Sequence, residues 1–520
     1  MVMIADLGDS WTRHHDSSFA AKFHRKSLRH RFYNAISFNS TAGQSIFLFL
    51  RQWLQICDKD HPECRRQPVM EEFWPKRVID VRDLHKLTLV ENQRRGEDYL
   101  VLSHCWGLPE DEAEAEKEKN RFCTTSKNYQ DRLRGVSYDE LPKTFQDAIQ
   151  VTRALGKKYL WIDALCIIQG PDGDWESEAK TMADIFACAY CTIAAGSARG
   201  WADGFLNLQS DSVDIGVQAA PSAPTCACDF DKDVDGGTLM KRAWVLQERV
   251  LSRRIIHFTS AHTYCECGDG VRCEQFTKLN PPYRKQYFFL DPNFPRRLYD
   301  SGYIRTLNFV QFLIRKYSTS GLSYATDRDV AIYSLGERMA QVLNTEMRYG
   351  IFRCFLSSLL LWKRDENKTS PISYHNRSVP SWSWMAYPGG LNFILDANSD
   401  LKVPMAVDLG FIKDGKALNI KVRKFSGDFR MEDKGEEYAI VDATEQIGSI
   451  WFDVADQIQL KDCNCSVVGM VGDERKEDAR KTYHVLIIRE KDGDGGYERV
   501  GVGKVEAQYV SRDCVAGTLW

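Results

Sequence analysis

The segment from Leu141 to Gln169, LPKTFQDAIQVTRALGKKYLWIDALCIIQ, constrains the fold more than any other part of the chain. Its apolar positions recur at helical spacing up to Leu155, and Gly156 follows as a helix stop. The run Tyr159–Ile162 is short, aromatic and β-branched, as expected of a strand that is covered on both faces. A helix, a turn and a buried strand in this order predict an α/β fold.

Two residues of this segment are candidates for a ligand site. Asp163 follows the predicted strand directly, and Cys166 lies three residues further on. Ligands of open α/β sheets bind outside the carboxyl ends of the strands, so both residues are expected on the ligand side. The alternative is that Asp163 only caps the following turn. At the start of the helix, the spacing of Thr144 and Asp147 predicts a capping box.

A second predicted strand, Tyr99–Leu102, leads into the loop SHCWG. Ser103 and His104 offer hydrogen-bonding groups there, and Trp106 offers a flat apolar face for a ring. Trp161, on the other strand, offers a similar face, although either indole could equally be a core residue. A Cys/His nucleophile pair at His104 and Cys105 is disfavoured because adjacent residues tend to point in opposite directions.

Two further helices carry buried acids. In the helix predicted over Asp174–Ala189, Glu178 lies among apolar positions, which favours a structural pairing with an arginine over catalysis. In the helix predicted over Arg242–Ser252, Trp244 and Glu248 are four residues apart and share a face. A partly desolvated carboxylate beside an indole is typical of functional acids. The alternative pairs Glu248 with Arg242, Arg249 or Arg253 as an ordinary helix acid.

The composition indicates a large globular protein. The 520 residues include 69 basic and 72 acidic side chains, so the chain lacks the basic excess of a general nucleic-acid or membrane-surface binder. The first residues do not resemble a secretion signal, and no apolar run is long enough to span a bilayer. We therefore expect a cytoplasmic protein, in which the 16 cysteines are thiols or ligands rather than disulfides.

Four regions follow from the patterning. Residues 1–95 begin with a polar, mobile tail and continue into a helix near Ile46–Ile56, and residues 96–275 form the α/β core. Residues 276–390 are expected to be helical, and residues 391–520 alternate in short β-like runs. The predicted helices of the third region are Tyr303–Tyr317, Asp327–Leu343 and Ile351–Trp362. Within the core, an acidic run after Gly107 and a long loop near 209–237 interrupt the pattern.

Two cysteine clusters raise the question of a metal. Cys57, His61 and Cys64 form the first cluster, and Cys265, Cys267 and Cys273 form the second. Neither supplies four ligands at zinc-finger spacing, and joining the two would need a tertiary contact, so we assign no metal ligand from the sequence and leave zinc binding open.

Five ordered blocks of the chain resemble the fungal heterokaryon-incompatibility (HET) domain family. The blocks are YLVLSHCWG from Tyr99, the segment from Leu141, DWESEAKTMADIFACAYCTIAA from Asp174, RAWVLQERVLS from Arg242, and PSWSW from Pro380. HET domains are distantly similar to Toll/interleukin-receptor (TIR) domains, which implies a flavodoxin-like, mainly parallel sheet flanked by helices. Some TIR domains cleave NAD with one glutamate that lies four residues after a tryptophan on a helix.

The resemblance implies a catalytic role for Glu248, with NAD or NADP as substrate and with no cofactor or metal. The residues then expected to bind the substrate are Ser103, His104, Trp106, Trp161, Asp163, Cys166, Arg242 and Trp244. We expect Ser103, Trp106, Asp163 and Glu248 to converge at the carboxyl ends of about five strands. Trp382 and Trp384 of PSWSW are expected to pack against the HET core, with at least one of them buried.

Three functions stay open at this point. The first is an NAD(P)-cleaving enzyme of fungal non-self recognition and programmed cell death, which self-associates and responds to partner incompatibility proteins. The second is a non-catalytic signalling or interaction module. The third is a HET fold recruited to a small-molecule reaction of secondary metabolism.

Overall fold

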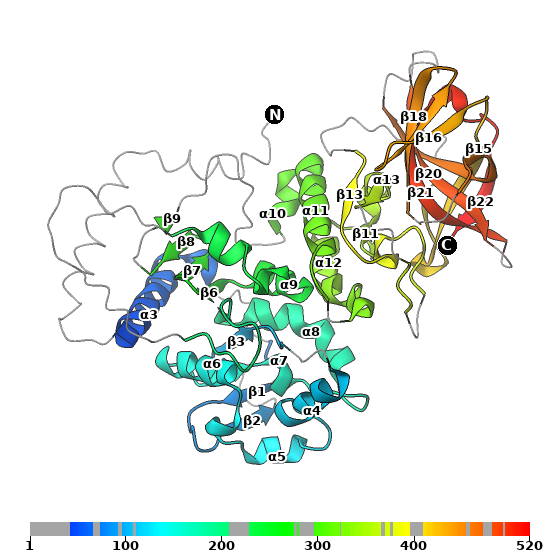
Figure 1. The fold of residues 1–520 in the computed structure, drawn as a ribbon. Coiled ribbons are helices and arrows are strands. Elements are labelled where there is room, and N and C mark those ends of the chain that lie inside the picture. Colours follow the sequence, from blue (N-terminus) through cyan, green and yellow to red (C-terminus); the bar gives the residue numbers. More distant parts are fainter. Residues whose placement is uncertain are drawn as a thin grey trace, which may run out of the picture. The chain divides into compact units, whose positions relative to one another are not determined.

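The computed structural model divides the chain into two compact units, Met1–Phe294 and Pro295–Trp520 (Figure 1). The described residues are 42–65, 73–91, 96–107, 111–206, 228–274, 278–279, 296–322, 324–365, 370–374, 378–395, 409–453, 458–471, 481–491 and 495–520. The expected polar tail, and residues 209–227 of the expected loop, lie outside them.

A nine-stranded mixed sheet forms the centre of the first unit, with strand order β2-β1-β4-β3-β5-β6-β7-β8-β9. The strands are β1 Arg77–Asp80, β2 Thr88–Glu91, β3 Tyr99–Ser103, β4 Tyr159–Trp161, β5 Cys191–Ala194, β6 Arg254–Phe258, β7 Thr263–Cys267, β8 Gly270–Cys273 and β9 Lys278–Leu279. Only the central strands β4, β3, β5 and β6 are parallel. The expected α/β class is confirmed, and the centre of the sheet is parallel as expected. The expected number of about five strands is wrong, because antiparallel strands extend the sheet on both sides.

The chain order of the parallel strands creates a switch point at β3. From β3 the chain forms β4 on one side and then returns to form β5 on the other side of β3. The loops after β3 and β5 therefore leave the same edge of the sheet in opposite directions, which is where α/β sheets bind ligands. All residues of β3, β4 and β5 are buried, as expected of central parallel strands.

Helices precede or connect these strands. They are α3 Ala42–Asp60, α4 Glu112–Phe122, α5 Tyr129–Arg134, α6 Lys143–Ala154, α7 Asp163–Cys166, α8 Trp175–Cys188 and α9 Ala243–Leu251. Helix α6 buries the predicted face, with Phe145, Ala148 and Ile149 at 0% exposure. Helix α3 confirms the helix expected near Ile46–Ile56, and the acidic run after Gly107 forms part of α4.

The capping box expected at the start of α6 is wrong. Neither side chain bonds the helix end, because both are fully buried and bind another loop. The Thr144 hydroxyl donates to the carbonyl of Gly200 over 2.9 Å. Asp147 Oδ2 accepts the backbone N–H groups of Phe205 and Leu206 at 2.7 and 2.9 Å. The two residues thus anchor the loop after β5 to α6.

The second unit begins with the helices α10 Arg296–Ser301, α11 Tyr303–Ser318 and α12 Val330–Val342. The last two confirm the predicted helices. The helix predicted over 351–362 is wrong, because the segment divides into β11 Ile351–Phe352, a 3₁₀ turn, the four-residue helix α13 Leu356–Leu359 and the start of β12 Trp362–Arg364. An apolar run of this length does not by itself separate helix from strand.

Both tryptophans of PSWSW are buried within the second unit. Trp382 contacts Tyr349 and Phe411, and its carbonyl accepts the Trp362 indole N–H at 3.0 Å. The Trp384 indole donates to Gly350 over 3.2 Å. Burial is confirmed, with exposures of 0% and 1%, but the partners described belong to the second unit instead of the HET core. Trp382 and Trp384 are therefore core residues of the second unit.

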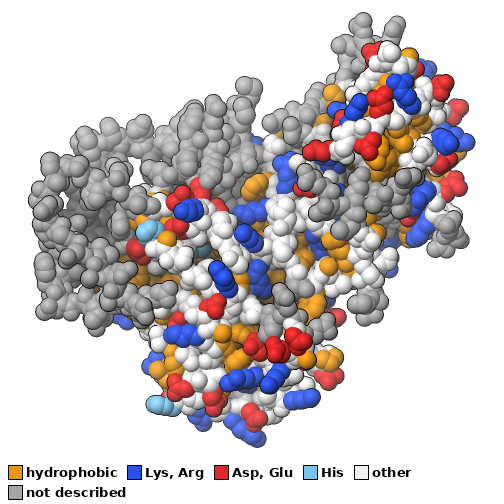
Figure 2. Space-filling model, viewed as in Figure 1, with side chains coloured by type: hydrophobic (Ala, Val, Ile, Leu, Met, Phe, Trp, Pro, Cys, Tyr) orange, Lys and Arg blue, Asp and Glu red, His pale blue; other side chains and the backbone are white. Residues whose placement is uncertain are grey.

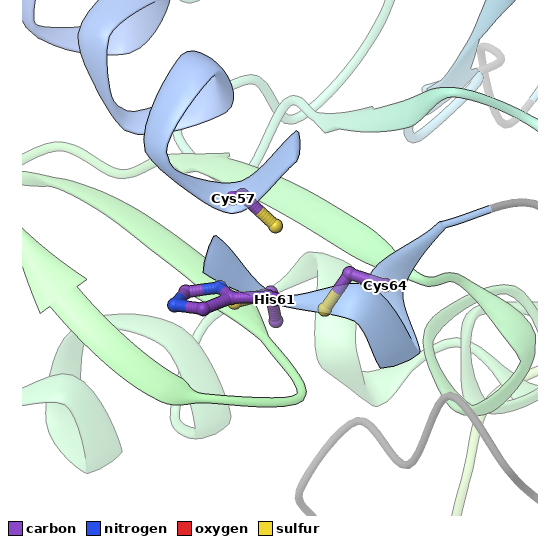
Figure 3. A group of neighbouring side chains, drawn as sticks. Cys57, His61 and Cys64 are labelled. Atoms are coloured by element: carbon purple, nitrogen blue, oxygen red, sulfur yellow. The ribbon is translucent and has the colours of Figure 1, made fainter. Parts of the chain in front are cut away.

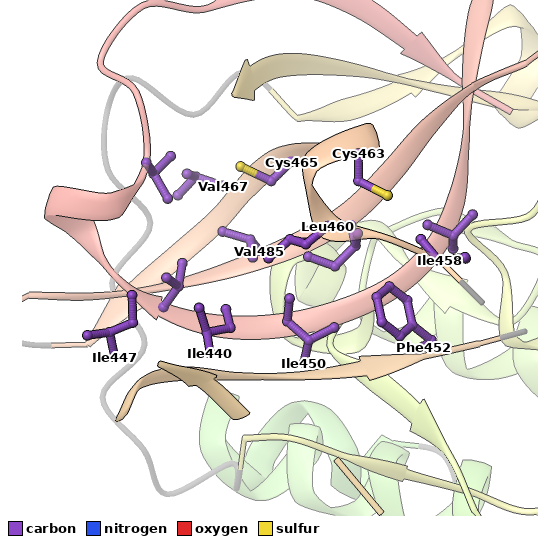
Figure 4. Close-up of a cluster of buried hydrophobic side chains, with 14 residues drawn as sticks. Ile440, Ile447, Ile450, Phe452, Ile458, Leu460, Cys463, Cys465, Val467 and Val485 are labelled. Carbon is purple, nitrogen blue, oxygen red and sulfur yellow. The ribbon is translucent and has the colours of Figure 1, made fainter. Parts of the chain in front are cut away.

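The C-terminal region is β-rich, as expected. Its strands are β14 Gly410–Ile412, β15 Ala417–Lys424, β16 Arg430–Asp433, β17 Tyr438–Asp442, β18 Glu445–Phe452, β19 Asn464–Val471, β20 Thr482–Lys491, β21 Gly496–Glu506 and β22 Val515–Leu519. They form one sheet, in which β22 pairs with both β15 and β21. Figure 4 shows the apolar side chains of β17, β18, β19 and β20 gathered into one core, among them Ile440, Ile450 and Val485.

The surface carries mixed charge. On the face drawn in Figure 2, lysine and arginine side chains alternate with aspartate and glutamate over both units. None of the helices in the described part of the chain combines the length and the apolar character that a bilayer crossing requires.

Candidate functional site

The site lies where β3 and β4 end. The Trp106 indole Nε1 donates a hydrogen bond of 2.8 Å to Asp163 Oδ2. The other carboxylate oxygen, Oδ1, accepts the backbone N–H of Ala164 at 2.7 Å, at the start of α7. Asp163 is the first residue of α7, whose N-cap is Ile162 without a side-chain cap bond, so the capping interpretation is not confirmed. The carboxylate instead orients the Trp106 ring. The Asp163 side chain is 26% exposed, so it faces solvent in part.

His104 lies behind this pair with its ring buried. Its Nδ1 is 3.8 Å from Asp163 Oδ1, beyond hydrogen-bonding distance. Burial lowers the pKa of His104 to about 4, although the charge of Asp163 opposes the shift, so the ring is neutral at pH 7. The guanidinium of Arg242 donates to the backbone carbonyl of His104 and thereby ties the start of α9 to this loop. Among the described residues, His104 Nε2 has no hydrogen-bond partner.

Glu248 completes the group from α9. Its side chain is buried, and burial raises its pKa to about 7; Asp163 adds to this rise, while Ser103 and Arg242 oppose it. The Ser103 hydroxyl is near enough to lower this pKa, yet the two groups do not meet in hydrogen-bonding geometry. Within the described residues, Ser103 Oγ and Glu248 Oε2 both lack a partner. A buried carboxyl that is half protonated near neutral pH is an unusual and costly group.

The arginine pairing considered for Glu248 is only partly present. Arg249 instead pairs with Glu266 over 3.1 Å and with Asp235, and Arg253 donates to backbone carbonyls. Arg242 is thus the arginine that acts on Glu248, and it does so through its charge rather than through a direct ion pair in the described structure. Glu248 is a buried group and not a surface helix acid.

Trp201 is a member of the site that the sequence analysis missed. Its ring stacks on Trp106 with the centroids 5.8 Å apart, and its backbone N–H donates to the Trp106 carbonyl at 3.2 Å. Each tryptophan has a glycine next to it in the chain, Gly107 after Trp106 and Gly200 before Trp201. The two glycines lie so close together that a Cβ on Gly107 would be 2.4 Å from the Cα of Gly200, so the stack requires glycine at position 107. The sequence feature that could have identified Trp201 is the pair Gly200-Trp201 in the loop after β5.

Three proposed binding residues are core residues or pack against other helices. Trp161 is 1% exposed and packs edge-on against Phe186 of α8. Cys166 is equally buried, and burial raises the pKa of its thiol to about 12, so it is a core thiol in this structure. Trp244 packs against Trp175 of α8 with the centroids 6.1 Å apart. The structure therefore brings together Ser103, His104, Trp106, Asp163, Arg242 and Glu248, whose chemical roles stay predictions.

Glu178 occupies a separate structural position. Burial raises its pKa, and the positive charge of Arg77 opposes this effect. Arg77 is itself 1% exposed and bonds Asp174 Oδ2 at 2.5 Å and the Cys166 carbonyl at 2.6 Å. Arg77 thus acts on Glu178 through its charge, while its direct ion pair is with Asp174, so the arginine pairing favoured from the sequence is only partly present.

The described residues also contain a cluster of potential metal ligands. It comprises Cys57, His61, Cys64 and Cys267, whose ligand atoms all lie within 4.8 Å of one another. Figure 3 shows the first three, with the side chains directed toward one another. The tertiary contact that the sequence left open is thus present, while Cys265 and Cys273 are not members of this cluster.

Residues 99–248 match the model of the family described as "Heterokaryon incompatibility protein (HET)". These residues form a HET domain. It begins at the first residue of β3 and ends at Glu248, so it contains every residue of the site described above. Helix α3, the metal-ligand cluster and strands β6 to β9 lie outside the matched range of the HET domain. Neither a curated protein nor a solved structure matches the chain.

Proposed function

We propose that the HET domain hydrolyses NAD or NADP at the nicotinamide–ribose bond, with Glu248 as the catalytic carboxylate. The observation that carries the proposal is the state of Glu248: it is buried, its pKa is about 7, and one of its oxygens has no partner among the described residues. The unpartnered groups of Ser103 and His104 come from the last residue of β3 and from the residue that follows it. A structural acid in such a place would normally be paired.

The strand order lends further support. Numbered along the chain, the parallel strands β3 to β6 run in the order two, one, three, four, which is the start of the flavodoxin-like order. Their ligand site is expected at the switch point, and Ser103 is the last residue of the strand at that point. The flavodoxin- and TIR-like assignment remains part of the proposal, since a shared fold does not by itself carry an activity.

The chemistry needs one carboxylate and a water molecule. The bond between ribose C1′ and the nicotinamide nitrogen breaks, and its electron pair leaves with the ring, which becomes neutral nicotinamide. Positive charge develops at C1′, where ionised Glu248 stabilises it. Water adds to C1′ and releases a proton, giving ADP-ribose or its 2′-phosphate.

The other residues bind and orient the substrate. Trp106, held by Asp163 and stacked on Trp201, offers an aromatic face to one of the two rings of the dinucleotide. Neutral His104 and Ser103 offer hydrogen bonds to the ribose hydroxyls. We further propose that the enzyme acts in the cytoplasm in fungal non-self recognition, where self-association triggers NAD(P) loss and cell death.

The test is nicotinamide release by the purified full chain incubated with NAD and, separately, with NADP. Glu248→Gln keeps the shape and removes the charge, so release should fall by about a hundredfold or more. Glu178→Gln is the matched control, because Glu178 is also a buried glutamate of the HET domain with a raised pKa, but it lies beside Arg77. This control variant should keep wild-type turnover.

Two results would reject the proposal. If the wild-type protein releases no nicotinamide, at high concentration or with a crowding agent that promotes self-association, the HET domain acts as an interaction module or on another small molecule. If both glutamine variants retain full turnover, Glu248 is not the catalytic group. The toxicity of each variant in yeast then tests a signalling role. If the HET domain acts as a signalling module, Glu248→Gln should be as toxic as wild type.

A further inference from the structure

The geometry points to a structural zinc site that joins the segment before the HET domain to the strands after it. We propose that Cys57, His61, Cys64 and Cys267 bind one Zn²⁺ ion as a closed Cys₃His set. Their four ligand atoms all lie within 4.8 Å of one another. In a tetrahedral site with Zn–S bonds of about 2.3 Å, neighbouring ligand atoms are about 3.8 Å apart, so the cluster has the scale that zinc requires.

The local fold explains why three ligands come from one short segment. Cys57 lies in the last turn of α3, and the His61 N–H donates to the Cys57 carbonyl at 3.2 Å, which continues the turn. The 3₁₀ turn Pro62–Cys64 then returns the chain, with a bond of 3.0 Å from the Cys64 N–H to the His61 carbonyl. Figure 3 shows the Cys57 and Cys64 side chains directed toward that of His61.

The fourth ligand comes from the far end of the sheet. Cys267 is the last residue of β7, and its sulfur is 3.5 Å from His61 Nδ1. The backbone of Cys267 pairs with Gly270 across the tight turn to β8, which fixes its position. The side chains of Cys57, Cys64 and Cys267 are almost fully buried, so water has little access to the sulfurs. Zinc sites that lack an open position for water are structural.

The surroundings match those of a bound zinc ion. His61 Nε2, the ring nitrogen other than the one near Cys267, is 3.6 Å from Asp269 Oδ2, slightly longer than a hydrogen bond. A carboxylate on this side of the ring is the usual partner of a zinc-ligating histidine. The Nε of Arg254 lies 3.1 Å from Cys57 Sγ. Three thiolates with Zn²⁺ and a neutral histidine carry one net negative charge, and this buried guanidinium, which also pairs with Asp58 Oδ1 at 2.6 Å, attracts that charge.

The proposed zinc ion would cross-link the segment before the HET domain to the segment after it. Cys57, His61 and Cys64 precede residue 99, and Cys267 follows residue 248, so none belongs to the range matched by the family. A single ion would close a loop of about two hundred residues that contains the HET domain. Loops closed by such a link lose entropy in the unfolded state, which stabilises the folded one.

The first experiment needs no variant. The full chain, purified without metal-affinity steps or chelators, should contain about one zinc per chain by mass spectrometry of the metals. After removal with a chelator under reducing conditions, added Co²⁺ should give the absorption of a tetrahedral thiolate complex. A protein with no zinc and no such cobalt spectrum would overturn the proposal, as would a disulfide between these cysteines in the freshly purified protein.

Variants then assign the ligands. Cys64→Ser and His61→Ala should each lower zinc affinity at least tenfold, while Cys273→Ser, a buried thiol in the neighbouring strand β8, should bind zinc as wild type does. Asp269→Asn should retain the stoichiometry and weaken affinity about 10- to 100-fold. Equal zinc content in Cys64→Ser and Cys273→Ser would place the ion elsewhere and reject the site.

Discussion

The indole of Trp106 and the carboxylate of Asp163 are joined by a hydrogen bond of 2.8 Å between the loops that leave β3 and β4. The two residues are 57 positions apart in the chain, and both are partly exposed. The bond fixes the plane of the Trp106 ring on one side, and the stack with Trp201 fixes it on the other. A ring held from both sides needs little ordering when a ligand binds.

The bond predicts a measurable coupling. Trp106→Phe keeps a ring for the Trp201 stack but removes the N–H, and we expect a loss of about 1–2 kcal/mol in the free energy of unfolding. Asp163→Asn removes the charge from the same bond. In urea denaturation the double variant should lose about 1 kcal/mol less than the two single variants together. Strict additivity would show that the bond contributes nothing in solution.

The pKa of Glu248 predicts how stability depends on pH. The folded protein raises this pKa from its usual 4.5 to about 7, so the folded state binds the proton more tightly than the unfolded state does. The contribution of Glu248 is therefore fully present below pH 4.5 and is lost as the pH rises through about 7, at a cost of about 3 kcal/mol. Ser103, Arg242 and Asp163 are the groups that face it.

Glu248→Gln should remove this dependence. Wild type should lose stability between pH 5 and pH 8, and the variant should lose less. The measurement is the change in the urea midpoint between the two pH values, compared between the two proteins. His104, whose pKa is lowered to about 4, destabilises both proteins below pH 6.5, and its effect largely cancels in the comparison. Gln replacement of the exposed Glu176 provides the control and should leave the pH profile unchanged. Parallel profiles for wild type and Glu248→Gln would contradict the raised pKa.

Local patterns predicted most elements of the HET domain. The strands Tyr99–Ser103 and Tyr159–Trp161 and helix α6 follow from residues close together in the sequence, because each element repeats its own periodicity. The placement of Ser103 and Asp163 at one sheet edge followed from the same strands, since parallel neighbours end on the same side. Glu248 was identified through its spacing from Trp244 and through the family resemblance.

The remaining features depend on contacts between distant segments. Thr144 and Asp147 have the spacing of a capping box, yet the loop near Gly200 and Phe205 takes their hydrogen-bonding groups. Cys267 joins His61 across 206 positions, a contact that cysteine spacing does not encode. The antiparallel edge strands likewise form through pairing that no local pattern specifies. Each of these features is set by residues that are distant in the sequence, and for Thr144 and Asp147 the distant groups also compete with the local cap.

The close approach of two glycines predicts a sharp difference between two alanine substitutions. Gly107 has φ +61°, and a Cβ there would lie 2.4 Å from Gly200 Cα, so Gly107→Ala must separate the two loops and disrupt the Trp106–Trp201 stack. Gly156 has a similar φ of +73° but nothing within 4 Å of the added Cβ. Gly156→Ala should cost only about 1 kcal/mol, from backbone strain.

Gly107→Ala should cost clearly more, about 3 kcal/mol, because steric overlap adds to the strain. Thermal melts of the two variants test the difference, and the tryptophan fluorescence of Gly107→Ala should also change as the stack separates. Equal melting points would show that the two loops are free to move apart.

The last prediction concerns a buried ion pair in the second unit. The Nε of Arg499 is 2.8 Å from Asp453 Oδ2, and both side chains are at most 1% exposed. The same guanidinium donates to the carbonyls of Leu360 and Trp362 at 2.6 and 2.5 Å and lies 3.5 Å from the centroid of the Trp362 ring. It therefore connects β21 to the segment that contains α13 and β12.

Asp453→Asn leaves this arginine buried without its counter-charge, so we expect a loss of about 3–5 kcal/mol in the stability of the second unit. The control is Glu498→Gln, which breaks the partly exposed pair of Glu498 and Arg489 in the same sheet and should cost less than about 1 kcal/mol. Differential scanning calorimetry of the full chain measures both changes. A loss for Asp453→Asn as small as that of the control would mean that water reaches Arg499 and solvates its charge.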